Sequence, residues 1–206
     1  MPATGKLKLI LLACLAALCL TGCEKQIEFT WAMERVPNNL DPQLAAASPE
    51  LIAVTNLYSG LFRLNADGEP VPDCAESYAV SPDGLTYTFT LKEGLAYTRN
   101  RGETAEYALT ARDFVFALRR VFRAETGSPY TDTYAAIKNS AAVLAGSMDE
   151  TALGVSAPDE RTVVIELSQP DPQLLYKLAL PGAMPCNEEF FESTEGTYGL
   201  TRASTM

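Results

Sequence analysis

No histidine occurs among the 206 residues of this sequence. Its absence removes the side chain that titrates nearest neutral pH, His-centred catalytic triads and the commonest metal ligand. The chain also lacks a phosphate-binding glycine loop, a Gly-x-Ser-x-Gly elbow, a Ser-x-x-Lys pair and a Cys-x-x-Cys pair. Nucleophilic and metal-dependent catalysis therefore have no visible residues, and we expect no catalytic residue, no cofactor and no metal.

Positive charge is scarce, because 16 lysines and arginines stand against 26 aspartates and glutamates, giving a formal net charge of −10. A basic face that tracks phosphates is not expected, so nucleic acid is excluded as a partner. Hydrophobic residues make up 47% of the chain and charged residues 20%, which is ordinary for a globular protein and enough for a core. The length predicts one or two domains.

No apolar run in the sequence is long enough to cross a bilayer. Lys6 and Lys8 precede an apolar run over residues 9–20, which matches the charged region and apolar core of a secretory signal. The run ends in Leu-Thr-Gly-Cys, which resembles the bacterial lipobox, where the cysteine is acylated and becomes the new N-terminus. We expect residues 1–22 to be a lipoprotein signal peptide and Cys23 to carry lipid. The alternative is an ordinary signal peptide with Cys23 incidental.

Few cysteines remain after such processing. Cys14 and Cys19 leave with the signal and Cys23 carries the lipid, which leaves Cys74 and Cys186. An exported chain meets oxidising surroundings, so these two can form a disulfide. Sequence separation does not show whether they approach within bonding range, and two buried free thiols are the alternative.

Alternation of apolar and polar residues predicts the strands. Tyr87 and Phe89 alternate with threonines, and the Ser-Pro-Asp-Gly just before them is typical of a turn. A hairpin is therefore predicted within residues 72–91. The same pattern predicts a first strand over residues 26–33 and a second hairpin over residues 153–167.

Caps and helical spacing predict the helices. Ser48 is the expected N-cap of a helix that keeps its apolar spacing to Arg63, and Thr110 with Asp113 forms a capping box before the clearest helix. The last turn of that helix carries three arginines, interpreted as a solvated end that matches the helix dipole, with an anion site as the alternative: Arg119, Arg120 and Arg123. Shorter helices are predicted near residues 140–145, after Asp171 and after Asn187. Hairpins mixed with helices indicate an α+β fold.

Two segments are predicted to be irregular. Residues 94–108 are polar and aperiodic, which indicates a surface loop. Residues 65–69 read Asn-Ala-Asp-Gly-Glu and place oxygen ligands at alternate positions, as a calcium loop would. They lack the length and the terminal acid of an EF-hand, so a turn is the preferred interpretation.

Carboxylates are the remaining catalytic candidates. Glycoside hydrolysis needs two acids at a fixed distance in space, which a sequence cannot show. By elimination, Asp83, Glu188 and Glu189 would serve an exported glycosidase-like hydrolase. The alternative is that they are ordinary turn and helix-end acids.

Six short segments are informative when they are considered together. They are Asn-Leu-Asp-Pro at 39–42, Asn-Leu-Tyr-Ser-Gly-Leu-Phe at 56–62, Pro-Asp-Cys-Ala-Glu-Ser-Tyr at 72–78, Ser-Pro-Asp-Gly-Leu-Thr-Tyr-Thr-Phe-Thr-Leu at 81–91, Leu-Thr-Ala-Arg-Asp-Phe-Val-Phe at 109–116 and Leu-Gly-Val at 153–155. In this order the chain resembles the extracellular solute-binding proteins of peptide ABC importers, the oligopeptide- and dipeptide-binding family. Each segment alone is weak, whereas six in series are specific.

The resemblance implies a periplasmic-binding-protein-like fold, in which ligand lies between large lobes. Residues 23–62 and 162–206 would be parts of the first lobe, and residues 63–161 an inserted smaller lobe. Members of the family are well over twice this length. The C-terminal lobe is therefore expected to be missing, leaving an N-terminal portion that binds weakly or not at all.

The resemblance also implies where a ligand would bind. Ala46, Ala47 and Ser48 match the extended segment that pairs with the backbone of a bound peptide, which is recognition by strand addition. Some members carry an acid at the position of Ala46. Tyr130 matches an aromatic residue that lines the cleft, and the alternative is a half-buried tyrosine whose hydroxyl bonds locally.

The function implied by the resemblance is that of a lipid-anchored substrate-binding component of an ABC importer, which binds peptides for uptake and catalyses nothing. Its partners would be a peptide, the permease subunits and, through the N-terminal lipid, the membrane. It would be exported and held at the outer face of the cell membrane, on the periplasmic side in a cell with two membranes. The carboxylate-dependent hydrolase is the alternative.

Overall fold

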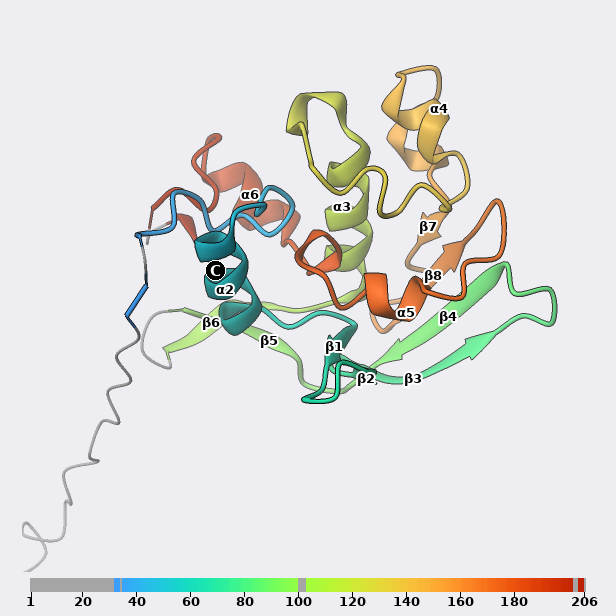
Figure 1. The fold of residues 1–206 in the computed structure, drawn as a ribbon, viewed down its shortest axis with the longest axis horizontal. Coiled ribbons are helices and arrows are strands. Elements are labelled where there is room, and N and C mark those ends of the chain that lie inside the picture. The colour runs from blue at the N-terminus through green and yellow to red at the C-terminus, as the bar shows by residue number, and fades with distance from the viewer. Residues whose placement is uncertain (1–31, 34, 100–102, 202–203, 206) are drawn as a thin grey trace, which may run out of the picture. The chain divides into compact units, whose positions relative to one another are not determined.

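A computed structural model describes residues 32–33, 35–99, 103–201 and 204–205 (Figure 1). The chain divides into two units, residues 1–33 and 34–206, and every helix and strand described lies in the second. The predicted signal peptide, Cys23 and all but the last two residues of the strand expected over 26–33 lie outside the described residues. No helix in the described part is long and apolar enough to cross a membrane.

An antiparallel four-stranded sheet forms the centre of the unit. Its strand order is β3-β4-β8-β7, made from β3 (Ala75–Val80), β4 (Thr86–Leu91), β8 (Thr162–Glu166) and β7 (Val155–Ser156). Phe89 of β4 lies opposite Val163 of β8, and Tyr87 opposite Ile165. All four side chains are buried, whereas Thr88 and Val164, which lie between them along the two strands, are partly exposed. Both predicted hairpins are therefore confirmed, the second with a first strand of two residues.

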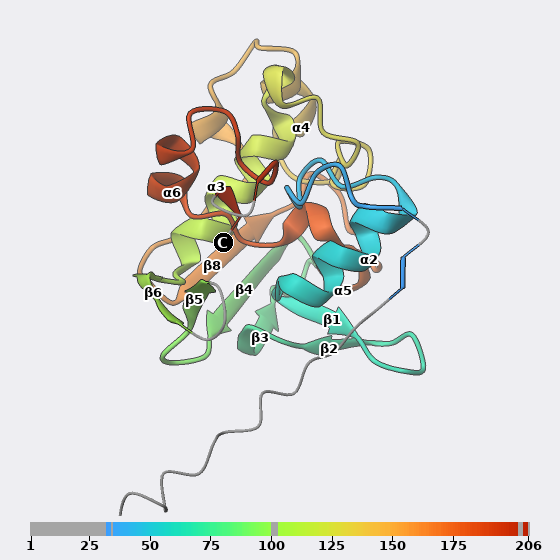
Figure 2. The same cartoon turned by 90° about the vertical axis from the view of Figure 1, so that its left-hand side faces the viewer.

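Helix α3 (Ala111–Phe122) lies across one face of this sheet (Figures 1 and 2). It buries Phe114, Leu118 and Val121 against the sheet residues, and the α+β fold class is confirmed. Because these large apolar side chains are removed from water, this contact contributes hydrophobic stabilisation to the unit.

Two short ribbons accompany the central sheet. In the first, β1 (Phe62–Leu64) pairs with β2 (Pro70–Pro72), and the side-chain oxygen of Asn65 accepts the N–H groups of Asp67 and Glu69 between them. The interpretation of residues 65–69 as a turn is thus confirmed.

The second ribbon overturns a prediction. Residues 94–108 were expected to be a surface loop, but β5 (Ala96–Arg99) pairs with β6 (Glu103–Ala108). Such a ribbon forms by backbone pairing, and its threonines and tyrosines favour strands without producing an apolar alternation. Tyr97 is buried, and Tyr107 packs beside a second hydrophobic cluster, so the ribbon is attached to the rest of the unit. The buried residues of this cluster are Phe116, Ala117, Cys186, Phe190 and Tyr198.

The first helix is shorter than predicted. Helix α2 (Ser48–Leu57) has Ala47, not Ser48, at its N-cap and ends before the predicted limit at Arg63. The chain turns extended at Tyr58 and passes Gly60, where an added Cβ would lie 3.0 Å from the Phe62 carbonyl oxygen. That close backbone approach favours glycine at this position, directly before β1.

The remaining helices are short and follow the predicted order. They are α4 (Ser140–Leu144), α5 (Leu174–Lys177), α6 (Glu188–Ser193) and the 3-10 turns Ala124–Thr126, Glu150–Ala152 and Pro181–Ala183. The side chain of Asn187 accepts the N–H of Phe190, which confirms the predicted start of α6.

Cys74 and Cys186 are free thiols in the structure. Both are buried, Cys74 in the main core and Cys186 in the second hydrophobic cluster. Burial raises the pKa of each thiol to about 12, so both stay protonated at neutral pH. Of the two alternatives, the structure has the buried thiols and not the disulfide.

The carboxylate that begins α3 is also buried. The N–H of Thr110 donates to Asp113 Oδ2 at 2.6 Å, as the predicted capping box requires, and the side chain of Asn187 donates to Oδ1 at 3.1 Å. Burial nevertheless dominates and raises the pKa of Asp113 from 3.8 to about 6. The folded state therefore holds this proton more tightly than the unfolded chain.

We expect the stability contribution of Asp113 to be fully present below about pH 4 and to be lost as pH rises through about 6, because the folded state binds the extra proton in that window. Urea denaturation across this range measures the slope. The slope should become flatter in Asp113→Asn and stay unchanged in Asp132→Asn, which alters an exposed aspartate. An unchanged slope in Asp113→Asn would contradict the assignment.

Candidate functional site

The candidate site is the extended segment that precedes α2, and a turn at Asp41 positions it. The side chain of Asn39 accepts the Asp41 N–H at 2.7 Å, and Asp41 Oδ1 accepts the Gln43 N–H at 3.0 Å. The Asp41 carbonyl then accepts the N–H groups of Leu44 and Ala45. Aspartate and asparagine side chains commonly fix turns in this way, and the Pro42 that follows presets the backbone.

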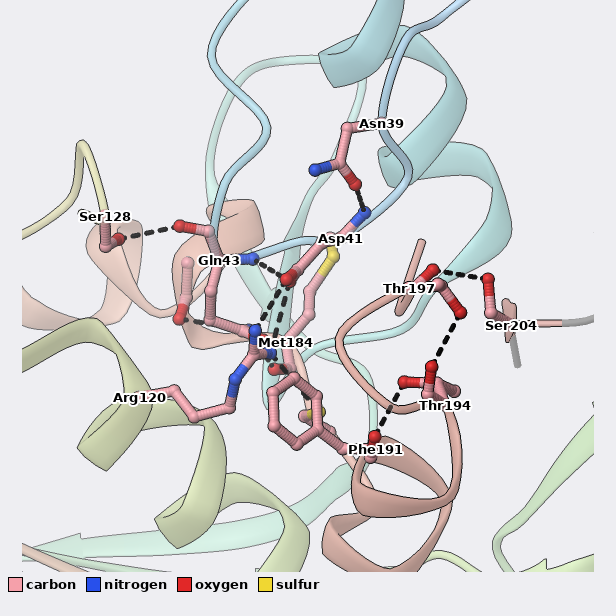
Figure 3. Close-up of polar contacts among 12 residues, drawn as sticks. Asn39, Asp41, Gln43, Arg120, Ser128, Met184, Phe191, Thr194, Thr197 and Ser204 are labelled. Atoms are coloured by element: carbon pink, nitrogen blue, oxygen red, sulfur yellow. Dashed lines mark hydrogen bonds and ion pairs between the residues drawn. The ribbon is translucent and has the colours of Figure 1, made fainter. Parts of the chain in front are cut away.

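A buried ion pair fastens this turn to α3 (Figure 3). The Arg120 guanidinium contacts Asp41 twice, with Nη2–Oδ2 at 2.6 Å and Nη1–Oδ1 at 3.2 Å. Each side chain is only 3% exposed. Burial alone would lower the pKa of Arg120, but the hydrogen bond that it donates to Asp41 and the attraction of nearby negative charge together outweigh burial, so the pKa is raised. The Arg120 guanidinium therefore stays charged inside the protein.

Other groups complete the surroundings of Arg120. Its Nη1 donates to Gln43 Oε1 at 2.7 Å and to the Cys186 sulfur at 3.4 Å. Its guanidinium carbon lies 4.1 Å from the centre of the Phe191 ring and 5.3 Å from that of Tyr198, which are cation–π contacts. Residues from the turn, α3 and α6 thus converge on one guanidinium.

The arginines of α3 do not behave alike, and the prediction of a solvated helix end is wrong for Arg120. Arg123 does fit a polar surface, where it forms a partly exposed ion pair with Glu150. The helical spacing could have distinguished Arg120 from Arg123. Arg120 follows Ala117 by three residues and Asp113 by seven, so it lies on the buried side of the helix.

The loop of Ser128 and Tyr130 holds the next part of the segment. Ser128 Oγ donates to the Gln43 carbonyl at 2.7 Å, and the Tyr130 hydroxyl donates to the Ala45 carbonyl at 2.5 Å. Tyr130 is 9% exposed, and its ring packs on Gly182, where an added Cβ would lie 2.5 Å from the ring. The structure thus gives Tyr130 a local hydrogen bond, and a ligand contact for it stays a prediction.

The segment itself leaves several backbone groups open. At Ala47 the backbone is extended, with φ −85° and ψ 153°, and its carbonyl accepts the Leu51 N–H at the start of α2. Among the described residues, the N–H and C=O of Ala46 and the N–H of Ala47 have no hydrogen-bond partner. Ala46 and Ser48 are exposed, but Ser48 is the first residue of α2 and does not belong to the extended segment that the resemblance implied. An extended ligand backbone could pair with these groups.

The carboxylates considered for hydrolysis do not form a pair. Asp83 lies in the β3–β4 turn, where it accepts the Ser81 hydroxyl and the Leu85 N–H. Glu188 and Glu189 are exposed in the first turn of α6, at the other end of the unit (Figure 1). The interpretation of these three acids as ordinary turn and helix-end residues matches their positions.

In the described part of the chain, no group of three or more acids and cysteines could hold a metal ion.

Comparison with known proteins identifies the class. The model of the bacterial extracellular solute-binding proteins, family 5 (middle), matches residues 69–201, and the chain belongs to this family. The predicted family is thereby confirmed.

Individual relatives carry related names. The probable deoxycholate-binding periplasmic protein YgiS of Escherichia coli is 35% identical over 72% of this chain and 27% of its own length. The oligopeptide-binding protein AmiA of Streptococcus pneumoniae is 34% identical over 78% of this chain and 24% of its own. This chain therefore spans about a third or less of the curated relatives it matches.

Solved structures agree in fold. OppA of Listeria monocytogenes, solved bound to peptide, matches 82% of this chain and 32% of its own with a TM-score of 0.75 and 28% identity. A substrate-binding domain of an oligopeptide ABC transporter from Bacillus anthracis matches 81% of this chain and 32% of its own, with a TM-score of 0.71 and 34% identity. The periplasmic-binding-protein-like fold is thus confirmed.

We expect Asp41→Asn to lower the free energy of unfolding by about 3–5 kcal/mol, because it leaves the Arg120 charge buried without a counter-charge. Urea denaturation measures the loss. Glu166→Gln is the matched control, since it breaks an ion pair with Lys138 in which both side chains are about half exposed, and should cost about 1 kcal/mol or less.

Adding Arg120→Met to Asp41→Asn should recover part of that loss, because the unpaired charge is then removed. Equal losses for Asp41→Asn and Glu166→Gln, or a double variant less stable than Asp41→Asn, would contradict the role assigned to the ion pair.

Proposed function

We propose that the chain is the peptide-binding part of an ABC importer and that residues Ala46–Ser48 pair with the ligand backbone. The open N–H and C=O of Ala46, an exposed residue, are the observation that carries this function. Relatives named for oligopeptides and dipeptides, and a neighbour solved with bound peptide, support it. Strand addition obtains affinity from main-chain hydrogen bonds, which every peptide offers.

The ligand class follows from the kind of groups left open. A free N–H and C=O on one exposed residue suit a partner that alternates acceptors and donors along its length, as a peptide backbone does. A bile acid, the ligand in the name of YgiS, has no such alternation. The separated positions of Asp83 and Glu188 give the hydrolase alternative no geometric support.

The same proposal includes the division into lobes. Residues 23–62 would begin the first lobe and the smaller lobe would follow from residue 63. Because β8 (Thr162–Glu166) pairs with β4 and β7, a boundary after β8 fits the sheet better than one before residue 162. Ligand would be held by closure of a further lobe over the open edge, a hinge motion common in proteins of this kind.

Titration of residues 23–206 with a pool of short peptides, followed by ¹⁵N NMR, tests the peptide proposal. We expect the amide signals of Ala46 and Ala47 to shift and that of Val80 in β3 to stay, since weak complexes are visible by this method. The same peptides with N-methylated backbones should lose the effect, because they cannot donate to the Ala46 carbonyl. Shifts caused by deoxycholate but not by peptides, or peptide-induced shifts that spare Ala46, would contradict the proposal.

We also propose that Cys23 carries lipid and holds the protein at the outer face of the cell membrane. The apolar run and the Leu-Thr-Gly-Cys sequence support this. A single acyl chain binds membranes only marginally, so firm attachment requires the several chains of a bacterial lipoprotein. The tethered protein would then reach the permease subunits at the membrane.

Replacing Cys23 by alanine should move the protein from the membrane fraction to the soluble fraction, because the acylated thiol is lost. Fractionation of cells that express the full chain, followed by immunoblotting, measures this. Cys74→Ala removes a buried thiol instead and should leave the protein with the membranes. If the Cys23 variant also sediments with membranes, the anchor lies elsewhere.

A further inference from the structure

We infer that Tyr130 is a positioning residue, whose hydroxyl polarises the peptide unit between Ala45 and Ala46 and so strengthens the Ala46 N–H as a donor to a ligand backbone. The inference rests on the proposed function. Its starting point is the hydrogen bond of 2.5 Å from the Tyr130 hydroxyl to the Ala45 carbonyl.

The covalent structure of the peptide unit supplies the coupling. The Ala45 carbonyl and the Ala46 N–H belong to one planar, conjugated group. A donor at the carbonyl draws electron density toward the oxygen and makes the N–H at the other end a better donor, which is the usual cooperativity of hydrogen-bond chains. The Ala46 N–H is one of the open groups of the segment.

The geometry of the peptide unit gives the direction of the Ala46 N–H. In a planar trans peptide unit, the C=O and the N–H point in opposite directions. The carbonyls of Gln43 and Ala45 both receive hydroxyl donors from the 128–130 loop. The Ala46 N–H shares a peptide unit with the Ala45 carbonyl and therefore points away from that loop, and Ala46 is exposed. The loop thus fixes which backbone groups remain available.

Packing holds the donor in place. The Tyr130 ring lies against Gly182, where no side chain would fit, and its centre is 6.4 Å from that of the Tyr134 ring. Burial raises the pKa of Tyr130 to about 12, so the hydroxyl keeps its proton at neutral pH. That single proton is already given to Ala45, which leaves none for a ligand.

The test compares Tyr130→Phe with Tyr134→Phe. Tyr134 is also buried and donates its hydroxyl to the Lys177 carbonyl at 3.0 Å, so both variants lose one hydroxyl-to-carbonyl bond. In the ligand-free chain, Tyr130→Phe should move the Ala46 ¹⁵N signal upfield and leave Leu178 in place. Tyr134→Phe should move Leu178, which shares the peptide unit of the Lys177 carbonyl, and leave Ala46 in place.

Binding supplies the second measurement. With the peptide pool, Tyr130→Phe should weaken binding about threefold to tenfold and Tyr134→Phe should leave it near the parent value. An unmoved Ala46 signal in Tyr130→Phe overturns the positioning role, and weaker peptide binding with that unmoved signal would assign Tyr130 a direct ligand contact. Peptide-induced shifts of the parent chain that spare Ala46 overturn the proposed function instead, while the Ala46 shift in Tyr130→Phe would still support the polarised peptide unit.

Discussion

The buried ion pair between Asp41 and Arg120 is the interaction on which the arrangement of the candidate site depends. The segment before α2 belongs to no sheet, so strand pairing does not hold it. Taking two charges out of water is costly, and only good geometry with further hydrogen bonds recovers that cost. Asp41 meets this condition with two contacts to the guanidinium and one to the Gln43 N–H. Other positions of the turn would leave a charge buried and unpaired.

The far end of the described chain closes around the same turn. The Leu40 N–H donates to the Gly199 carbonyl at 2.7 Å, and a Cβ on Gly199 would lie 2.2 Å from the Asp41 nitrogen. Gly199 also has φ +74°, a conformation that other residues rarely adopt. Phe191 and Tyr198 cover the guanidinium from this side. The ion pair is therefore enclosed by residues that lie far apart in the sequence.

Local patterns in the sequence predicted local structure well and the site only in part. Alternation around Phe89 and the capping box at Asp113 depend on neighbouring residues, so the hairpins and α3 could be predicted. The β5–β6 ribbon escaped because its pairing leaves no apolar alternation. The pairing of Arg120 with Asp41 could not be predicted for another reason, since the two residues are 79 positions apart and nothing near either one indicates its partner. Ala46, Ala47 and Ser48 came from a family resemblance and not from their own chemistry.

The composition of the open segment fits ligand recognition through the backbone. Alanine and serine side chains are short, so they leave room beside the open N–H and C=O groups and read little of a ligand's side chains. Rigidity then matters more than contact area, because an ordered segment has less conformational entropy to lose on binding. The ion pair fixes the turn at one end, α2 fixes the other, and the hydroxyls of Ser128 and Tyr130 occupy the inner carbonyls. A segment held in this way would offer the same groups to peptides of different sequence.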